Sequence, residues 1–191
     1  MNSHFVKPLI FISSLIASFG AHAWTVSPND SAISFVSIKK TNIGESHTFT
    51  EFSGSITDGK AHIIIKPDSI DTRVPIRNER MREFLFESEI YPTIEVTAEV
   101  DDILSGLKLG STTTMPVPAT LSMHGESQDI TMVVRITKNS EESIVVTSVQ
   151  PILVRAASFK MVDGIVKLSS LVNGLAIAES VPTSFSLMFK K

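Results

Sequence analysis

Alternation of hydrophobic and polar residues is the feature that most restricts what this chain can fold into. Hydrophobic side chains recur at every second position, with few exceptions, through four stretches of the sequence. This period of two places successive side chains on opposite faces of a β-sheet. The clear strands are 94–100, 117–123, 130–136 and 181–189, and less regular candidates are 32–39, 48–56, 61–66 and 144–149. We therefore expect about eight strands.

Turn residues separate these candidate strands. Asp58-Gly59 lies between two of them, Pro67-Asp68 ends one, and the segment 138–140 joins the pair that precedes Ile144. Many short strands at this spacing favour a closed antiparallel barrel or a sandwich over an α/β fold.

One segment, residues 70–92, departs from this pattern and has helical spacing. On an ideal helix its hydrophobic residues share one face, three arginines line one edge of that face, and Glu79 and Glu83 lie nearly opposite. The hydrophobic residues are Met81, Phe84 and Leu85, and the arginines are Arg73, Arg77 and Arg80. A second short helix is predicted to run from Asp163, as its N-cap, to Leu175, with Gly174 interrupting its end.

The first 23 residues read as a cleaved secretory signal peptide. Lys7 is followed by an apolar run over residues 9–19 and by Ala21-His22-Ala23, a small-x-small cleavage site. The apolar run is too short for a spanning helix, so we expect no transmembrane segment after cleavage. The mature chain is then one domain, residues 24–191, exported to a bacterial periplasm, although an extracellular location is also compatible.

Composition excludes some kinds of function. The chain has no cysteine, which rules out a thiol nucleophile, a thiolate metal site and stabilisation by disulfides. Its formal net charge of -3 argues against a nucleic-acid partner, which usually needs a basic face.

Several stretches together resemble the YceI-like family of bacterial secreted proteins. In residues 72–92, Arg77 opens an R-x-x-R-M-R helix that is followed by Phe86 and Tyr91-Pro92, similar to the family's Arg-Asp-x-His-Leu helix, Phe-Phe-Asp end and Tyr-Pro. The other stretches are WTVSPNDSAISF from Trp24, FTEFSGSI from Phe49 and LSMHG from Leu121. The resemblance implies an all-β fold, a single lipocalin-like antiparallel barrel with one or two short helices at its mouth. It also implies an apolar lumen that holds a polyisoprenoid or another long amphiphile.

The sequence departs from the family pattern at the presumed mouth. Asn78 stands where the family has Asp, Arg80 where it has His, and IKKTNIGESHTFTEF replaces a His-x-G-x-x-x-v-x-G-x-F pattern. Arg73, Arg77 and Arg80 could bind a phosphate, carboxylate or quinone oxygen there, since guanidinium groups offer paired donors. Alternatively they pair with Asp71, Glu79, Glu83 or Glu87 and fasten the helix over the barrel.

The sequence does not decide whether the hydrophobic residues line a lumen or fill a core. Those of the helix, Met81, Phe84, Leu85 and Phe86, line the upper lumen or plug the barrel. The inward positions of the strands are equally open, and the ligand-binding candidates among them are Phe35, Phe52, Val96, Leu121 and Phe185.

The histidines do not suggest catalysis or metal binding. His47, His62 and His124 lack metal-ligand spacing and are expected to be surface or turn residues. Glu45-Ser46-His47 lacks the third group and the oxyanion site that a hydrolase needs. We therefore expect no enzyme activity, no metal and no required cofactor.

The leading hypothesis is an exported, non-enzymatic protein that sequesters or transports a long-chain amphiphile such as a polyisoprenoid or quinone. The alternative is an envelope interaction or stress-response module with a filled core and no lipid. Homodimerisation is compatible with either.

Overall fold

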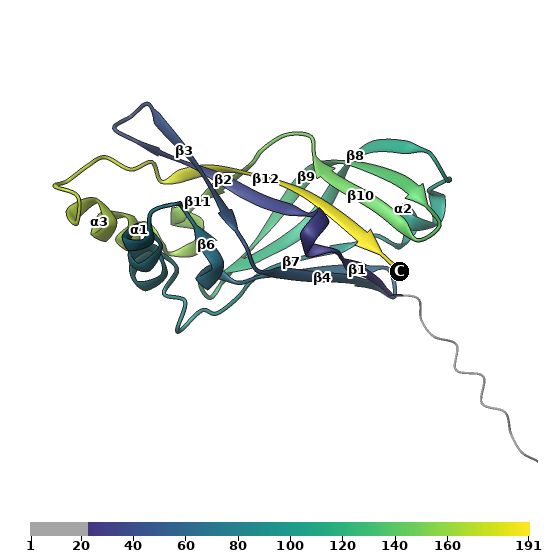
Figure 1. Ribbon diagram of the computed structural model, residues 1–191, viewed down its shortest axis with the longest axis horizontal. Coiled ribbons are helices and arrows are strands. Elements are labelled where there is room, and N and C mark those ends of the chain that lie inside the picture. Colours follow the sequence, from purple (N-terminus) through teal and green to yellow (C-terminus); the bar gives the residue numbers. More distant parts are fainter. Residues whose placement is uncertain (1–22) are drawn as a thin grey trace, which may run out of the picture.

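The computed structural model describes residues 23–191, which form one continuous antiparallel sheet (Figure 1). The strands are β1 (Trp24–Val26), β2 (Ala32–Lys39), β3 (Ile43–Phe49), β4 (Phe52–Thr57), β5 (Lys60–Ile65), β6 (Ile70–Asp71), β7 (Ile94–Glu99), β8 (Thr112–Met123), β9 (Glu126–Ser140), β10 (Ser143–Ser148), β11 (Ile152–Arg155) and β12 (Ser180–Lys190). The α-helices are α1 (Pro75–Arg80), α2 (Asp101–Gly106) and α3 (Val162–Ser170), and a π-helical segment, η3 (Met81–Phe86), continues α1. The signal peptide predicted over residues 1–23 lies almost wholly outside the described part of the chain.

The sheet closes into a barrel because β1 pairs on both of its sides. Thr25 and Val26 of β1 face Lys190 and Phe189 of β12, while Trp24 and Thr25 pair with β4. The ring therefore runs β1, β4, β5, β7, β8, β9, β10, β12 and back to β1, a closed barrel of 8 strands. The predicted all-β, lipocalin-like fold is confirmed.

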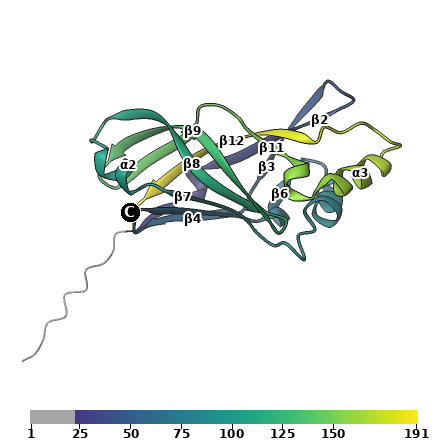
Figure 2. The same ribbon diagram turned by 180° about the vertical axis from the view of Figure 1, so that it is seen from behind.

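The remaining strands extend the barrel at one end. The middle of β12, Thr183–Ser186, pairs with β2, which continues through β3 to β6, and the start of β12 pairs with β11. Helices α1 and α3 lie at this same end, and the C-terminus lies at the opposite end, as both views show (Figures 1 and 2). We call the end with α1 and α3 the mouth.

The barrel interior follows from the alternation. Ile94 in β7, Leu121 in β8, Val134 in β9 and Ile144 in β10 are all buried, and Ile144 is only 1% exposed. Because neighbouring strands present their hydrophobic positions to one side, the ring encloses an apolar interior.

Two strand predictions need correction. The single strand predicted over 48–56 is broken at Thr50-Glu51, where the Thr50 amide donates to the Ser69 carbonyl and the chain passes from the mouth strand β3 into the barrel strand β4. The turn predicted at 138–140 is two residues later, because β9 continues to Ser140.

The arginine helix is also shorter than predicted. Pro75 occupies its first turn and holds the preceding residue, Val74, in an extended conformation. Arg73 lies before the helix with φ of 60°, so the prediction that it shares a helical edge with Arg77 and Arg80 is wrong. The wider π-helical turn from Met81 then shifts the phase of the side chains that follow.

The second predicted helix, α3, begins and ends earlier than expected. Met161, and not Asp163, is its N-cap residue, and it stops at Ser170. Asn173 and Gly174 both have positive φ, which ends helical geometry before Leu175. None of the helices within residues 23–191 has the length and hydrophobicity of a transmembrane span.

Candidate ligand-binding site

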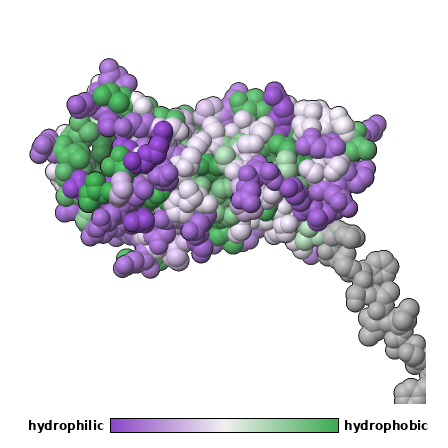
Figure 3. Space-filling view, in the orientation of Figure 1, coloured by the Kyte–Doolittle hydropathy of each residue, from purple (hydrophilic) through white to green (hydrophobic). Residues whose placement is uncertain are grey.

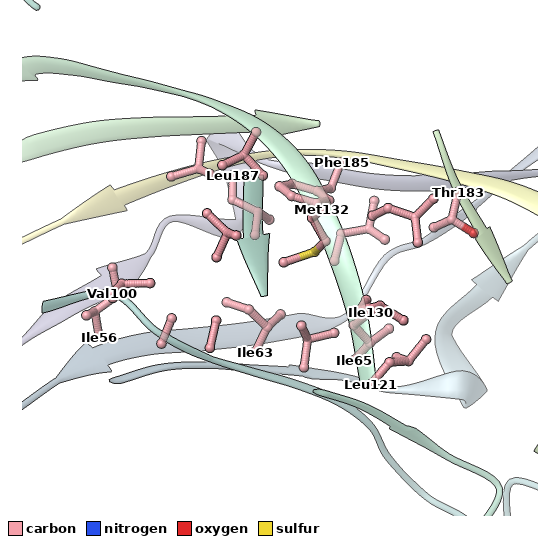
Figure 4. Close-up of a pocket in the computed structure, with 18 of the residues that line it drawn as sticks. Ile56, Ile63, Ile65, Val100, Leu121, Ile130, Met132, Thr183, Phe185 and Leu187 are labelled. Atoms are coloured by element: carbon pink, nitrogen blue, oxygen red, sulfur yellow. The ribbon is translucent and has the colours of Figure 1, made fainter. Parts of the chain in front are cut away.

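An apolar chamber of about 180 Å³ lies inside the barrel. We call it the inner chamber. Side chains from facing strands, including Ile63, Met132 and Leu187, point into it (Figure 4). Among the described residues that line it, Thr183 alone has a polar side chain. The inner chamber can therefore exclude water and accept hydrocarbon, but it offers almost nothing to bind a polar group.

A second chamber of about 440 Å³, the outer chamber, lies at the mouth. Its walls come from β2 and β3 on one side and from α1, η3 and α3 on the other. Met123 and Val154 line both chambers, so the two chambers are adjacent. In the space-filling view, hydrophobic residues gather at the mouth among polar ones (Figure 3).

A charged cluster lies on one wall of the outer chamber. Arg77 Nη1 donates to Glu45 Oε2 at 2.6 Å, and Lys39 Nζ lies 2.9 Å from the same oxygen. Arg77 Nη2 donates to the Thr72 carbonyl at 2.7 Å. The hydrogen bond from Lys39 and the charge of Arg77 hold the pKa of Glu45 below its ordinary value despite desolvation. Glu45 is therefore ionised and contacts two cations, so the cluster keeps one positive charge.

His47 lies beside this cluster and is only 2% exposed. Its Nε2 lies 2.7 Å from the Ser37 hydroxyl, and its ring meets the Phe35 ring edge-on at 5.2 Å. Burial, and then the charge of Arg77, lowers the pKa of His47 to about 4. The imidazole is therefore neutral at neutral pH, and the prediction that His47 is a surface or turn residue is wrong.

Two polar atoms at this wall are buried and have no hydrogen-bond partner within residues 23–191. They are His47 Nδ1 and Arg77 Nε. Both residues line the outer chamber.

The predicted ligand-binding residues are divided between the two chambers and the surrounding packing. Val96, Leu121 and Phe185 line the inner chamber. The outer chamber is lined by Phe35, Arg77, Arg80, Met81 and Leu85.

The other predicted residues line neither chamber. Arg73 donates from Nη2 to the Ser46 carbonyl, and Phe84 lies under the Lys167 ammonium, 5.2 Å from ring centre to Nζ. Phe86 packs edge-on against Phe49, and Phe52 packs on the hydrophobic core.

Sequence reasoning missed the polar residues that face Arg77. The predicted partners of the arginines lay within the helical segment, but Arg77 pairs with Glu45 of β3. The signal was the register of the β2–β3 hairpin, which places Ser37 opposite Glu45 and Phe35 opposite His47. The period of two then puts all four side chains on the chamber face.

The other two histidines of the described part of the chain, His62 and His124, lie outside both chambers. His62 pairs with Glu95 at 3.0 Å on the barrel surface. His124, at the turn between β8 and β9, contacts Glu87 Oε2 at 2.6 Å and the Phe159 carbonyl at 3.0 Å, and so joins η3 to the segment before α3.

The Ser37–His47 pair does not form a catalytic triad within residues 23–191. A triad needs a carboxylate on His47 Nδ1, and that atom has no partner. Within the same range, no three His, Cys, Asp or Glu side chains are grouped to bind a metal ion.

Comparison with known proteins gives a consistent set of similarities. The sequence pattern of the YceI-like domain matches residues 24–189. A polyisoprenoid-binding domain from Saccharophagus degradans, implicated in plant cell wall breakdown, is similar in structure with a TM-score of 0.84 and 34% sequence identity, over 87% of this chain and 97% of that one. No curated protein sequence matches the chain significantly.

More distant solved structures share the fold. BcnA of Burkholderia cenocepacia has a TM-score of 0.67 at 19% identity, over 85% of this chain and 98% of that one. A YceI protein of Campylobacter jejuni has a TM-score of 0.52 at 17% identity, over 76% of this chain and 84% of its own.

Proposed function

The chain belongs to the YceI-like family, and from this premise we propose that it is an exported, non-enzymatic protein that binds a polyisoprenoid or related long-chain lipid inside its barrel. The bound lipid is sequestered or transported and is not chemically changed. No cofactor takes part.

The apolar inner chamber, which adjoins the outer chamber, is the observation that carries this proposal. Its lining is hydrocarbon apart from Thr183. Each methylene buried there contributes about 0.8 kcal/mol, so a chain of several isoprene units can bind tightly with few polar contacts. An interaction module with a filled core would not contain this chamber.

The similarity to the Saccharophagus degradans domain supports the same class of ligand, since that domain is described as polyisoprenoid-binding. Export is supported by residues 1–23, whose sequence has the three regions of a signal peptide. The proposal therefore places the protein in the periplasm, with the mature chain beginning at Trp24.

Ligand co-purification tests the proposal. The full chain is produced in a bacterial host with its own first 23 residues, isolated from the periplasm, and analysed by native mass spectrometry and then by organic extraction. We expect a mature mass that begins at Trp24 and an adduct that releases an isoprenoid or another long chain. A protein that is empty, and remains empty after incubation with tetraprenyl and longer isoprenoids, would contradict lipid binding and favour the interaction module.

A further inference from the structure

Exposed hydrophobic side chains surround the opening of the outer chamber, and we call them the rim. They come from three segments that are distant in the sequence, namely β3, the start of α1 and the loop after α3. They are Ile43, Val74, Ile76 and Val172, whose exposed fractions lie between 40% and 51%. Three of them, Val74, Ile76 and Val172, also line the outer chamber, so they lie where it opens to solvent. Ile43 shares a strand face with Glu45 and His47, which line the chamber as well.

Basic side chains surround the same opening. The charged residues that line the outer chamber are Lys39, Arg77 and Arg80, together with Glu45 and Glu179. Two exposed basic residues adjoin this set. Lys40 follows Lys39, and its amide donates to the Ala176 carbonyl in the loop after α3, while Arg73 directly precedes Val74 of the rim. Glu79, the acidic residue of α1, is exposed and does not line the chamber.

The excess of basic residues is local to the mouth. The whole chain has a formal net charge of -3, so the rest of the molecule is acidic on balance. Isolated exposed hydrophobic residues are normal on a protein surface, but a set that encircles one opening and is bordered by charge marks an interaction site.

Apolar and basic groups in this arrangement fit the surface of an anionic bilayer. Apolar side chains insert at the boundary of the acyl chains, while lysine and arginine keep their charged ends at the level of the phosphate head groups. Each basic residue held near such a surface raises affinity about fivefold. A folded partner protein on the rim would cover an empty chamber, whereas a bilayer presents hydrocarbon directly to it.

We propose that the mouth docks on an anionic phospholipid bilayer, with the rim among the acyl chains and the neighbouring basic residues at the phosphate head groups. This inference rests on the proposed function, because the bilayer is then the place where the carried lipid is collected or delivered. It adds a surface and a partner that the binding of a ligand does not itself require. The C-terminus, at the opposite end of the barrel, then points away from the membrane (Figure 1).

Vesicle binding by the mature protein tests the proposal. Co-sedimentation compares vesicles of phosphatidylcholine alone with vesicles of equal parts phosphatidylcholine and phosphatidylglycerol, both free of isoprenoid. Five basic residues against two acidic ones at the opening imply binding to the anionic vesicles that is tighter by on the order of 100-fold. Added salt should weaken this binding, because it screens exposed charges.

A single introduced thiol can report which end of the protein meets the bilayer, because the chain has no cysteine. Ile76→Cys and its matched control, Leu109→Cys, are each labelled with an environment-sensitive dye. Leu109 is 59% exposed and follows α2, which lies at the end opposite the mouth (Figures 1 and 2). On the anionic vesicles we expect the emission of the dye at position 76 to shift to the blue and that of the dye at position 109 to stay unchanged.

Substitutions at the mouth should weaken docking without disturbing the fold, since the chosen positions are exposed. Ile76→Ser removes an inserted side chain and should reduce affinity for the anionic vesicles about tenfold. Lys40→Glu replaces attraction by repulsion and should also reduce it by roughly tenfold or more. The matched controls, Leu109→Ser and Lys108→Glu, make the same changes at the opposite end and should leave affinity nearly unchanged.

The outcomes separate this inference from the function beneath it. Failure to bind the anionic vesicles, equal binding to both kinds of vesicle, or a blue shift at position 109 in place of position 76 would overturn docking. A solution dimer that Ile76→Ser converts to a monomer would also overturn it, because a second copy of the chain would then cover the rim. A co-purified lipid without docking leaves the proposed function standing. Docking without any bound lipid refutes that function and leaves the docking surface.

Discussion

Filling the inner chamber with a protein side chain should strengthen the fold and weaken lipid binding at the same time. Ala98 of β7 lies opposite Ala61 of β5, and both line the inner chamber, whose other aliphatic side chains are larger. We predict that Ala98→Phe places its ring in this chamber. A dry cavity of about 150 Å³ is known to admit a benzene ring, and the inner chamber has about 180 Å³.

The gain in stability and the loss of affinity can both be estimated. At about 24 cal/mol per Å³, filling the whole chamber could contribute at most about 4 kcal/mol, so we expect a gain of roughly 1–3 kcal/mol after the cost of ordering the ring. A ring that keeps out one isoprene unit, with its five carbons, removes about 4 kcal/mol of binding free energy, or about 10³-fold in affinity.

The assay pairs urea unfolding, followed by the fluorescence of the single tryptophan, Trp24, with calorimetric titration of a tetraprenyl quinone. Thr97→Phe, one position away on the outer face of β7, is the matched control and should leave affinity unchanged. A variant destabilised by more than about 2 kcal/mol would show that the chamber cannot accept the ring. A stabilised variant with unchanged affinity would refute the reasoning, because the chain would then bind elsewhere.

Further predictions concern pH, packing and the side-chain amide of Asn78 in α1. Folding lowers the pKa of His47 from 6.5 to about 4, so the unfolded state binds more protons than the folded state between these pH values. The free energy of unfolding should therefore fall by about 3 kcal/mol as the pH drops from 7 to 4. Urea unfolding at both pH values should show a smaller fall in His47→Phe. At Gly164 an added Cβ would meet the η3 backbone, so Gly164→Ala should cost roughly 1–3 kcal/mol in thermal unfolding, whereas Gly106→Ala, with open space around it, should be nearly neutral. Asn78 accepts hydrogen bonds from the amide and hydroxyl of buried Thr72, so Asn78→Ala should destabilise by about 1–3 kcal/mol and Asn78→Asp by less; equal losses in both variants would contradict this role.

The barrel could be predicted from the sequence because its signal is local. Alternation along each strand reports which face is buried, and turn residues such as Asp58-Gly59 mark where strands end. The break at Thr50-Glu51 carried no such mark, because both flanking segments alternate and only the contact with Ser69 reveals the change of direction.

The polar site could not be predicted in the same way because its members meet across the fold. The charge of Arg77 suggested pairing within its own helix, since residues three or four positions apart are neighbours there. Its partner, Glu45, is brought to it by the pairing of β3 with β6. The burial of His47 likewise depends on side chains from another strand, since Phe35 and Ser37 of β2 contact its ring.

The many partners of β12 have a consequence for how the chain folds. This strand contacts β1, β2, β10 and β11, so it both closes the ring and attaches the mouth strands. It is synthesised after every other described strand, and its pairing with β1 joins the two ends of the described sequence. Contacts of such high sequence separation slow folding, so the chain should remain open until its last strand is available. Until β12 has been made, the chain therefore has neither a closed ring nor attached mouth strands.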